Sequence, residues 1–194
     1  MITASTQDSS LAKRLQRETT AEVLFDEFSR GLYSTDASIY QIKPLGVVVP
    51  KTEEDVLATI SIANDTGVSV TMRGGGTSQC GQTVGDGIII DVSKHLNRLI
   101  SVDPETRRAV VQPGIVLDQL NALLNPHRLF FPVDVSTSSR ATIGGMTANN
   151  SCGARSIRYG KMVDNVRAVD AVPADGNHMH AGEGGQGTSV VGPD

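Results

Sequence analysis

An arginine followed by three glycines, Arg73 to Gly76, is the stretch of this sequence best suited to chemistry, and Thr77 and Ser78 come directly after it. Glycines cost backbone entropy on folding, so a run of them indicates a sharp bend or a close approach by another group. Successive peptide N–H groups in such a bend can converge into an anion-binding nest. The planar guanidinium of Arg73 suits phosphate. The stretch predicts a phosphate cradle, with a ligand-free glycine turn as the alternative.

Two familiar nucleotide motifs fit this stretch poorly. Gly76 to Thr83 nearly matches the P-loop pattern, but Gln82 stands where that pattern has its lysine. The P-loop and the nicotinamide G-x-G-x-x-G motif both open a helix. Here the β-branched run Ile88 to Ile90 follows and favours a strand. A nucleotide-phosphate-binding module therefore stays only as a weaker alternative.

The elements around the glycine stretch are expected to form a small α/β lobe from about residue 42 to 92. Residues 45–49 are apolar and predict a buried strand that ends at Pro50. A capping box at residues 52–55 predicts a helix that ends at Gly67. Strands are expected directly before the glycine stretch, to Met72, and after it, from Gly87.

The N-terminal region is expected to be helical. A helix is predicted from Leu11, and Thr19 to Glu22 has the spacing of a second capping box. The helix that follows is expected to carry Leu24 and Phe28 on one face and to end at Gly31.

Beyond the lobe we expect a hairpin, a helix and a late strand. The hairpin joins residues 99–102 to 108–112 across a turn, and the helix covers residues 116–125. The strand covers residues 166–172, and no closing element is predicted after His180.

A second informative stretch, Pro132 to Gly160, is rich in small and hydroxylated residues. A loop of this length is usually functional or disordered. Ile143 and Met146 are apolar anchors that argue against disorder. Small side chains along the backbone would suit a chain that follows a flat or extended ligand.

Composition excludes several classes of partner. The 194 residues carry a formal net charge of -4, which disfavours a large nucleic-acid surface. No apolar run approaches the roughly 20 residues of a membrane span, and the N-terminus lacks a signal-type apolar core. Cys80 and Cys152 are too few for a zinc or iron–sulfur site, and His178 and His180 lack a third ligand. We expect reduced thiols, no metal and a cytoplasmic location.

Taken together, an ordered series of motifs resembles one family. The chain is similar to the FAD-binding domain of the vanillyl-alcohol oxidase and p-cresol methylhydroxylase type, in the branch with D-lactate, glycolate and D-2-hydroxyglutarate dehydrogenases. The resemblance covers about residues 33–176. The residues that carry it are 33–38, 44–50, 52–56, 73–78, 111–114 and 142–149.

The resemblance implies an α+β fold of two subdomains with FAD between them, truncated before the substrate cap domain. We expect an N-terminal helical segment over 1–32, a first FAD-binding subdomain over 33–98 and a second, incomplete one over 99–194. The implied pyrophosphate cradle consists of Arg73, Gly74, Gly75, Gly76, Thr77, Ser78, Gly81 and Gln82. The residues implied to line the flavin and ribityl side are Pro132, Asp134, Thr142, Gly144, Gly145, Ala148, Asn149, Ser151 and Gly153.

Some relatives carry a histidine in the glycine loop that bonds covalently to the flavin. Thr77 occupies that position here, so we expect non-covalent FAD. The implied function is oxidation of a small-molecule 2-hydroxy acid by the complete enzyme. The electron acceptor and the catalytic base stay unassigned. The alternative is a truncated FAD-binding fragment without activity of its own, which could associate into a homo-oligomer through uncovered surface.

Overall fold

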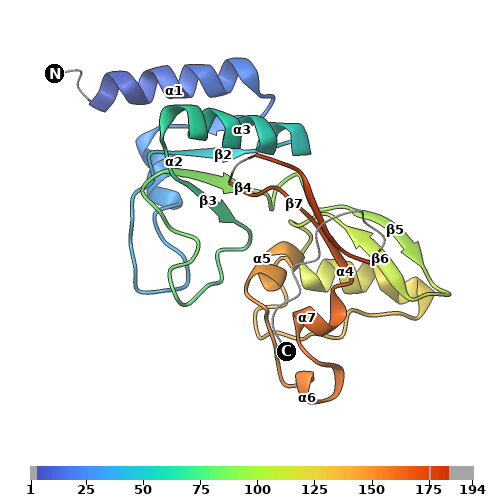
Figure 1. Cartoon of the computed structure of the whole chain (residues 1–194). Helices are drawn as coiled ribbons and strands as arrows, with labels where there is room; N and C mark the ends of the chain where they lie inside the picture. Colours follow the sequence, from blue (N-terminus) through green and yellow to red (C-terminus); the bar gives the residue numbers. More distant parts are fainter. Residues whose placement is uncertain (1–3, 175, 184–194) are drawn as a thin grey trace, which may run out of the picture.

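The computed structural model describes residues 4–174 and 176–183 (Figure 1). The helices are α1 Ala4–Glu18, α2 Glu27–Leu32, α3 Glu53–Thr66, α4 Leu117–Leu124, the 3-10 helix η1 Asn125–His127, α5 Ile143–Ala148, α6 Ser156–Tyr159 and α7 Met162–Asn165. The strands are β1 Glu22–Leu24, β2 Gly46–Val49, β3 Val70–Arg73, β4 Ile88–Asp91, β5 Leu99–Asp103, β6 Arg108–Val111, β7 Ala168–Ala171 and β8 Met179–Gly182.

Four strands form one mixed sheet in the order β1-β2-β4-β3. The strands β2, β4 and β3 are parallel, and β1 pairs with β2 in the antiparallel direction. In the register, Ile90 lies beside Val48 on one side and Met72 on the other. The predicted order of strand, helix, strand, loop and strand is confirmed, and the glycine loop is the connection from β3 to β4.

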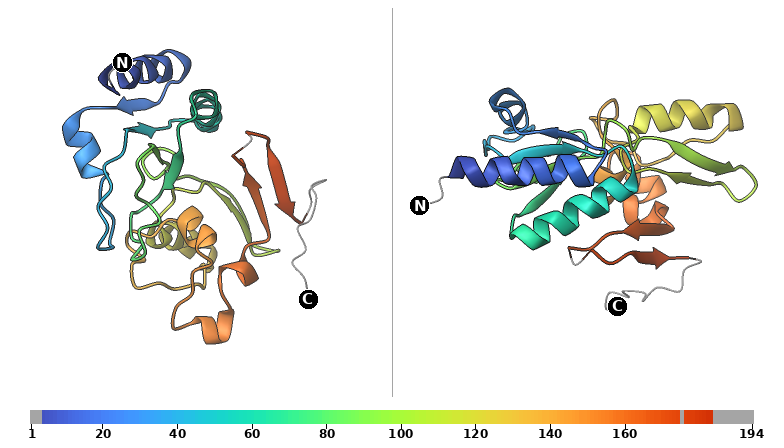
Figure 2. Two further views of the ribbon diagram at one scale, coloured as in Figure 1. Left: turned by 60° about the vertical axis from the view of Figure 1, so that its left-hand side comes forward. Right: turned by 90° about the horizontal axis from the view of Figure 1, so that it is seen from above.

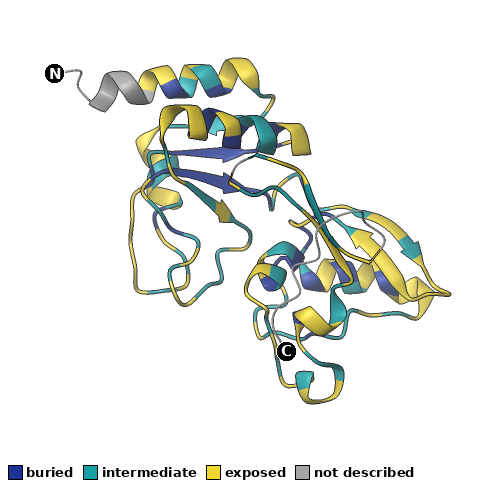
Figure 3. Ribbon diagram, in the orientation of Figure 1, coloured by how far each residue is buried: buried dark blue, intermediate teal, exposed yellow. Residues whose placement is uncertain are grey.

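Both faces of the two central strands are buried, as is usual for parallel strands (Figure 3). Val48, Ile88 and Ile90 face α1 and α3, which lie on one side of the sheet and contribute Leu15 and Ile62 to the same core cluster. A smaller cluster on the opposite face contains Val47, Val49 and Ile89. The alternating β-branched side chains thus place the sheet between two apolar layers.

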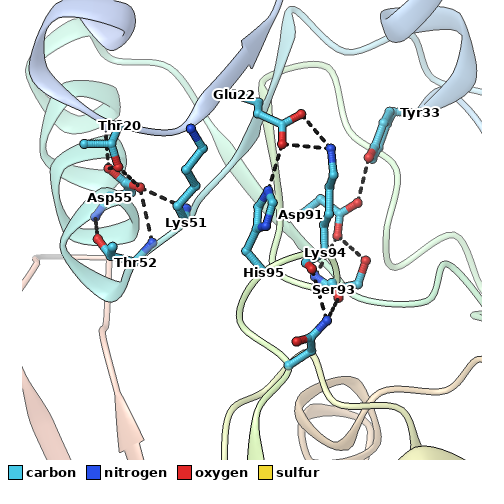
Figure 4. A network of polar contacts seen from close by, with 11 residues as sticks. Thr20, Glu22, Tyr33, Lys51, Thr52, Asp55, Asp91, Ser93, Lys94 and His95 are labelled. Carbon is cyan, nitrogen blue, oxygen red and sulfur yellow. Dashed lines mark hydrogen bonds and ion pairs between the residues drawn. The ribbon is translucent and has the colours of Figure 1, made fainter.

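The helix α3 begins and ends where its sequence predicts. Thr52 caps its N-terminus in a box with Asp55, and Gly67 ends it with a left-handed φ of 66°. Asp55 is buried and accepts hydrogen bonds from the backbone N–H groups of Thr20, Lys51 and Thr52 (Figure 4). One carboxylate therefore caps α3 and ties the N-terminal region to it.

The predicted start of the helix after Thr19 is wrong, although α2 ends at Leu32, next to the predicted stop at Gly31. Residues 22–24 form strand β1, and α2 begins only after Asp26, whose side chain caps Ser29 N–H. Phe28 is 79% exposed rather than part of a core face. The apparent capping box fails because Thr20 bonds to Asp55 of α3 and Glu22 bonds to Lys94 and His95 beyond β4 (Figure 4).

A second core lies beside the hairpin β5-β6 and the helices α4, α5 and α7. It includes Leu117, Leu120 and Leu124, the predicted stripe of α4, together with Ile143 and Met162. The predicted hairpin is confirmed, with Asp103 opposite Arg108. The stretch read as a long loop, 132–160, contains α5 and α6. Figure 2 shows this group of helices from two further sides.

The chain does have a closing strand after the predicted late strand. The strands β7 and β8 pair in an antiparallel hairpin, with Asp170 opposite His180. Glu183 follows β8 and forms an ion pair of 2.7 Å with Arg108 of β6, so the two hairpins are linked. The rest of the predicted glycine-rich tail, 184–194, lies outside the described residues.

The division into segments 1–32, 33–98 and 99–194 stays a prediction. Within the described chain, none of the helices is both long and apolar enough to cross a membrane.

Candidate cofactor site

The glycine loop, defined here as residues 73–83, leaves the carboxyl end of β3 and returns to β4. In open α/β sheets, ligands bind in the crevice outside the carboxyl ends of the parallel strands. The local sequence therefore places the loop where the fold class puts its ligands. The views in Figures 1 and 2 agree that this connection extends from the sheet toward α5.

Arg73 holds the two limbs of the loop together and anchors them to the segment before β2. Its guanidinium donates to the carbonyl oxygens of Thr83 at 3.2 Å and Thr35 at 2.9 Å. Ala37 N–H donates to Gly76 O at 3.1 Å, which adds a second link to the same segment. Arg73 is thus a brace for the loop, and its predicted contact with phosphate stays a prediction.

A partly buried chain of polar contacts links Arg73 to strand β4. The guanidinium of Arg73 lies 5.2 Å from the ring centroid of Tyr33. The hydroxyl of Tyr33 donates to Asp91 of β4 at 2.7 Å (Figure 4). Burial, together with this hydrogen bond to the carboxylate, raises the pKa of Tyr33 above its ordinary value. The phenol therefore stays neutral and remains a donor.

Asp36 fastens the return limb of the loop. Its carboxylate accepts from Ser38 N–H at 2.8 Å and from the hydroxyl of Thr83 at 3.1 Å. Burial raises the pKa of Asp36, but hydrogen bonds from Ser38 and Thr83 outweigh burial and lower the pKa below its usual range. Asp36 is therefore ionised at neutral pH.

Neighbouring residues of the chain leave no room for a side chain at the first two glycines of the loop. A Cβ on Gly74 would lie 2.2 Å from the hydroxyl oxygen of Thr142, and one on Gly75 would lie 2.2 Å from Arg140 O. Gly76 and Gly81 have positive φ angles of 63° and 72°. Gly74 and Gly75 bring the loop backbone against the residues that precede α5, a role that the sequence analysis did not assign to them.

The loop presents a run of amide donors. Among the described residues, the backbone N–H groups of 74–79 have no acceptor, whereas Cys80 N–H donates to the hydroxyl of Ser78. Donors of this kind bind water or an anion. The arrangement is therefore chemically suited to a group with several anionic oxygens, such as a diphosphate.

The helix α5 supports the loop but offers few donors. Thr142 caps it by accepting from Gly145 N–H, while Gly144 N–H donates to Pro113 O at 2.8 Å. Ile143 N–H is bonded to Ile115 O. The first amides of α5 are thus used within the protein, and the glycine loop is the richer source of donors.

The structure brings the two predicted groups of site residues together at α5. Gly74 packs on Thr142, and Gln82 donates to the side-chain oxygen of Asn149 at 3.1 Å. Gly145, Ala148 and Asn149 are exposed. The site residues that meet or flank this junction are Arg73, Gly74, Gly75, Gly76, Thr77, Ser78, Gly81, Gln82, Thr142, Gly144, Gly145, Ala148 and Asn149.

The remaining predicted residues shape the turns that flank α5. A Cβ on Gly153 would lie 1.7 Å from Asp134 O, and the Asp134 carboxylate accepts from Arg155 N–H. Ser151 N–H donates to Met146 O. Pro132 is partly buried beside this region. For Asp134 and Ser151, these contacts are to residues around α5 rather than to the glycine loop.

Sequence reasoning missed the residues outside the glycine loop that contact it and hold it in place. Residues 33–38 were named in the sequence analysis only as part of the resemblance, and Thr35, Asp36 and Ala37 were given no part in holding the loop. The carbonyl of Arg140 gave no signal in the sequence, because a backbone contact leaves no mark on residue type. Cys80 and Cys152 are exposed free thiols beside the junction.

The histidines do not form a metal site in the described chain, where no three His, Cys, Asp or Glu residues are placed to share a metal ion. His178 is exposed. His180 is partly buried instead, and its ring bonds to Asp170 across the β7-β8 hairpin at 2.5 Å.

Solved structures share this architecture. BBE-like 1 of Physcomitrella patens superposes with a TM-score of 0.80 over 92% of this chain and 38% of that protein, at 24% identity. An alkyldihydroxyacetonephosphate synthase superposes with a TM-score of 0.77 at 21% identity, covering 84% of this chain and 33% of that protein. The fold is the mixed α/β FAD-binding fold of the vanillyl-alcohol oxidase and p-cresol methylhydroxylase type.

The model of the FAD binding domain family matches residues 44–182, and the chain belongs to this family. It is 40% identical over 163 residues to the D-2-hydroxyglutarate dehydrogenase of Pseudomonas putida, covering 82% of this chain. It is 34% identical to the glycolate oxidase subunit GlcD of Bacillus subtilis over 81% of the chain, and 37% identical to the D-lactate dehydrogenase of Archaeoglobus fulgidus over 70%. The chain spans 16%, 34% and 30% of these three relatives.

Proposed function

We propose that this chain binds FAD non-covalently and that the glycine loop donates its backbone N–H groups to the diphosphate of the cofactor. The observation that carries the proposal is the run of amides over 74–79 that has no acceptor in the described protein. Membership of the FAD binding domain family supports FAD as the ligand. The braces from Arg73 and Asp36 keep the loop in shape, so little ordering is needed when the anion binds.

We further propose that the protein to which this chain corresponds oxidises a 2-hydroxy acid. The support is the similarity to dehydrogenases named for D-2-hydroxyglutarate and D-lactate and to a subunit of a glycolate oxidase. Bound FAD supplies a hydride acceptor. The residues of this chain bind the cofactor, orient it between the loop and α5 and limit the access of water to its diphosphate.

The first test is a titration of the protein with FAD, followed by the fluorescence of the flavin. We expect saturable binding that is weakened at least about tenfold by Arg73→Ala combined with Gly75→Val, because the pair removes the brace and pushes a side chain into Arg140 O. Arg17→Ala combined with Gly31→Ala is the matched control, since both residues lie away from the loop. Equal affinity of the loop variant and the wild type would show that the loop is assigned wrongly.

The covalent state is tested on the loaded protein. After denaturation in acid, the flavin is expected in the supernatant, because Thr77 has no imidazole to form a bond with the isoalloxazine ring. Flavin that remains with the precipitated polypeptide would contradict this part of the proposal.

A second candidate is an FAD-binding portion without catalytic activity of its own. The observation that favours it is the small share, 16%, of the D-2-hydroxyglutarate dehydrogenase that the chain spans. Anaerobic mixing of the FAD-loaded chain with D-lactate, glycolate or D-2-hydroxyglutarate separates the two candidates. Loss of flavin colour supports the enzyme, and persistent colour with all three acids supports the binding portion.

A further inference from the structure

A chain of side-chain hydrogen bonds crosses from the glycine loop to the end of α5. The hydroxyl of Ser78 donates to the side-chain oxygen of Gln82 at 2.7 Å, and the side-chain nitrogen of Gln82 donates to Asn149 at 3.1 Å. The same hydroxyl accepts from Cys80 N–H at 3.1 Å. Both polar atoms of the Gln82 amide are therefore used, each in the role that its chemistry allows. We call the Gln82–Asn149 contact the amide bridge.

Both ends of the amide bridge are held by their own surroundings. Asn149 caps the C-terminus of α5, and its backbone N–H donates to Gly145 O, so the helix fixes the backbone from which its side chain extends. Gln82 follows Gly81, which has a left-handed φ and lies so close to the ring of Tyr40 that a Cβ would be 2.6 Å away. The bridge therefore joins two anchored points rather than two mobile ones.

Few other contacts join the glycine loop to the residues around α5. Within the described residues, it is the one side-chain hydrogen bond between the glycine loop and the stretch 140–153. The other contacts there are close packing of Gly74 on Thr142 and of Gly75 on Arg140. Packing and the hydrogen bond both oppose separation of the two segments, but the hydrogen bond also requires a particular distance and direction.

We infer that Gln82 and Asn149 are a positioning pair that sets the spacing between the glycine loop and α5. The inference rests on the proposed function, since this spacing decides how a dinucleotide such as FAD is held at its diphosphate and beyond it. A lost neutral hydrogen bond is expected to weaken FAD binding about three- to tenfold. Ser78 acts through Gln82, because its hydroxyl orients the amide for donation to Asn149.

The native cysteines allow a test of the spacing that needs no cofactor. Cys80 and Cys152 are exposed, and they lie on the loop side and the α5 side of the bridge. Nitroxide labels on both thiols report the distance between the two segments by pulsed electron resonance. We expect a narrow distribution in the wild type and a broader one in Gln82→Ala and in Asn149→Ala. Gln79→Ala is the matched control, an exposed glutamine of the same loop that makes no hydrogen bond in the described structure.

Charge variants separate a lost hydrogen bond from a lost side chain. Asn149→Asp keeps an acceptor for Gln82, and Gln82→Glu keeps an acceptor for Ser78 and for the amide nitrogen of Asn149. We expect near-native distance distributions for each single variant. The double variant places two carboxylates in contact, so its distribution should broaden. Equal distributions in all variants would overturn the inference.

The same variants keep the inference and the proposed function distinct. If the wild type fails to bind FAD while the distances change as expected, the proposed function fails and the positioning pair stands. If FAD binds but neither distance nor affinity responds to Gln82→Ala, the positioning pair is wrong and the proposed function stands.

Discussion

At the scale of single residues, glycines differ in how much space surrounds them, which the sequence alone does not show. Gly75 lies under Arg140 O, whereas Gly31 in α2 has nothing within 4 Å of an added Cβ. We predict that Gly75→Ala lowers the free energy of unfolding by about 1–3 kcal/mol, because the clash is with backbone that cannot turn aside. Gly31→Ala should raise it by about 0.5–1 kcal/mol through its effect on helix entropy.

Urea unfolding followed by circular dichroism measures both changes. Equal stability of the two variants would mean that the loop does not pack on Arg140 as described. The sequence indicated a sharp bend or a close approach by another group at these glycines, and their contact with a ligand stays a prediction. The structure adds a close approach to Arg140 O, a backbone contact that periodicity and motif cannot reveal.

Arg73 illustrates the same limit of sequence reasoning. Its position beside three glycines predicted a contact with phosphate, which stays a prediction, and the structure adds contacts to Thr35 O and Thr83 O. These acceptors are backbone atoms separated from Arg73 by up to 38 residues along the chain. A contact of that kind depends on the tertiary fold, so residue types alone could not predict it.

At the scale of elements, the cap that Asp55 forms on α3 should make the stability of the protein depend on pH. Burial raises the pKa of Asp55, but hydrogen bonds from Thr20, Lys51 and Thr52 outweigh burial and lower the pKa below its ordinary value. The stabilisation is therefore complete above the unfolded pKa of about 3.9 and is lost as the pH falls through the folded value. We predict that Asp55→Asn costs about 2–3 kcal/mol at pH 7, because charge-assisted hydrogen bonds are lost.

The measurement is the free energy of unfolding between pH 7 and pH 3. The wild type should lose stability on acidification, and Asp55→Asn should lose less over the same range. Glu53→Gln is the control, since Glu53 is an exposed first-turn residue of the same helix. A wild type and an Asp55→Asn variant with parallel pH profiles would contradict the assigned role of the cap.

Helices and strands with clear capping or apolar patterns could be predicted from the sequence. Elements that form through contacts with residues distant in the sequence could not. The capping box of Thr52 and Asp55 forms in the structure as the sequence predicts, so α3 was located correctly. The similar spacing at Thr19 predicted a helix start that does not form, because Thr20 bonds to Asp55 and residues 22–24 pair with β2. The strand β8 was missed because its sequence, Met179–Gly182, has little β-branched character, and it forms through pairing with β7.

At the scale of the whole molecule, a ligand between the loop and α5 should protect both sides of the junction at once. We predict that saturating FAD slows alkylation of Cys80 and Cys152 by iodoacetamide, as measured by mass spectrometry, because both thiols are exposed beside the proposed site. The denatured protein with FAD is the control and should react at the rate without FAD. Unchanged rates at both cysteines in the folded protein would argue against the junction as the binding site.

The central claim is that main-chain amides of the glycine loop hold the diphosphate of FAD, and a crystal structure of the protein with FAD tests it most directly. We predict that oxygens of the diphosphate lie within hydrogen-bond distance of backbone N–H groups between Gly74 and Gln79, with Arg73 still bonded to the loop carbonyls. A diphosphate bound elsewhere, with these amides facing only solvent, would contradict the account.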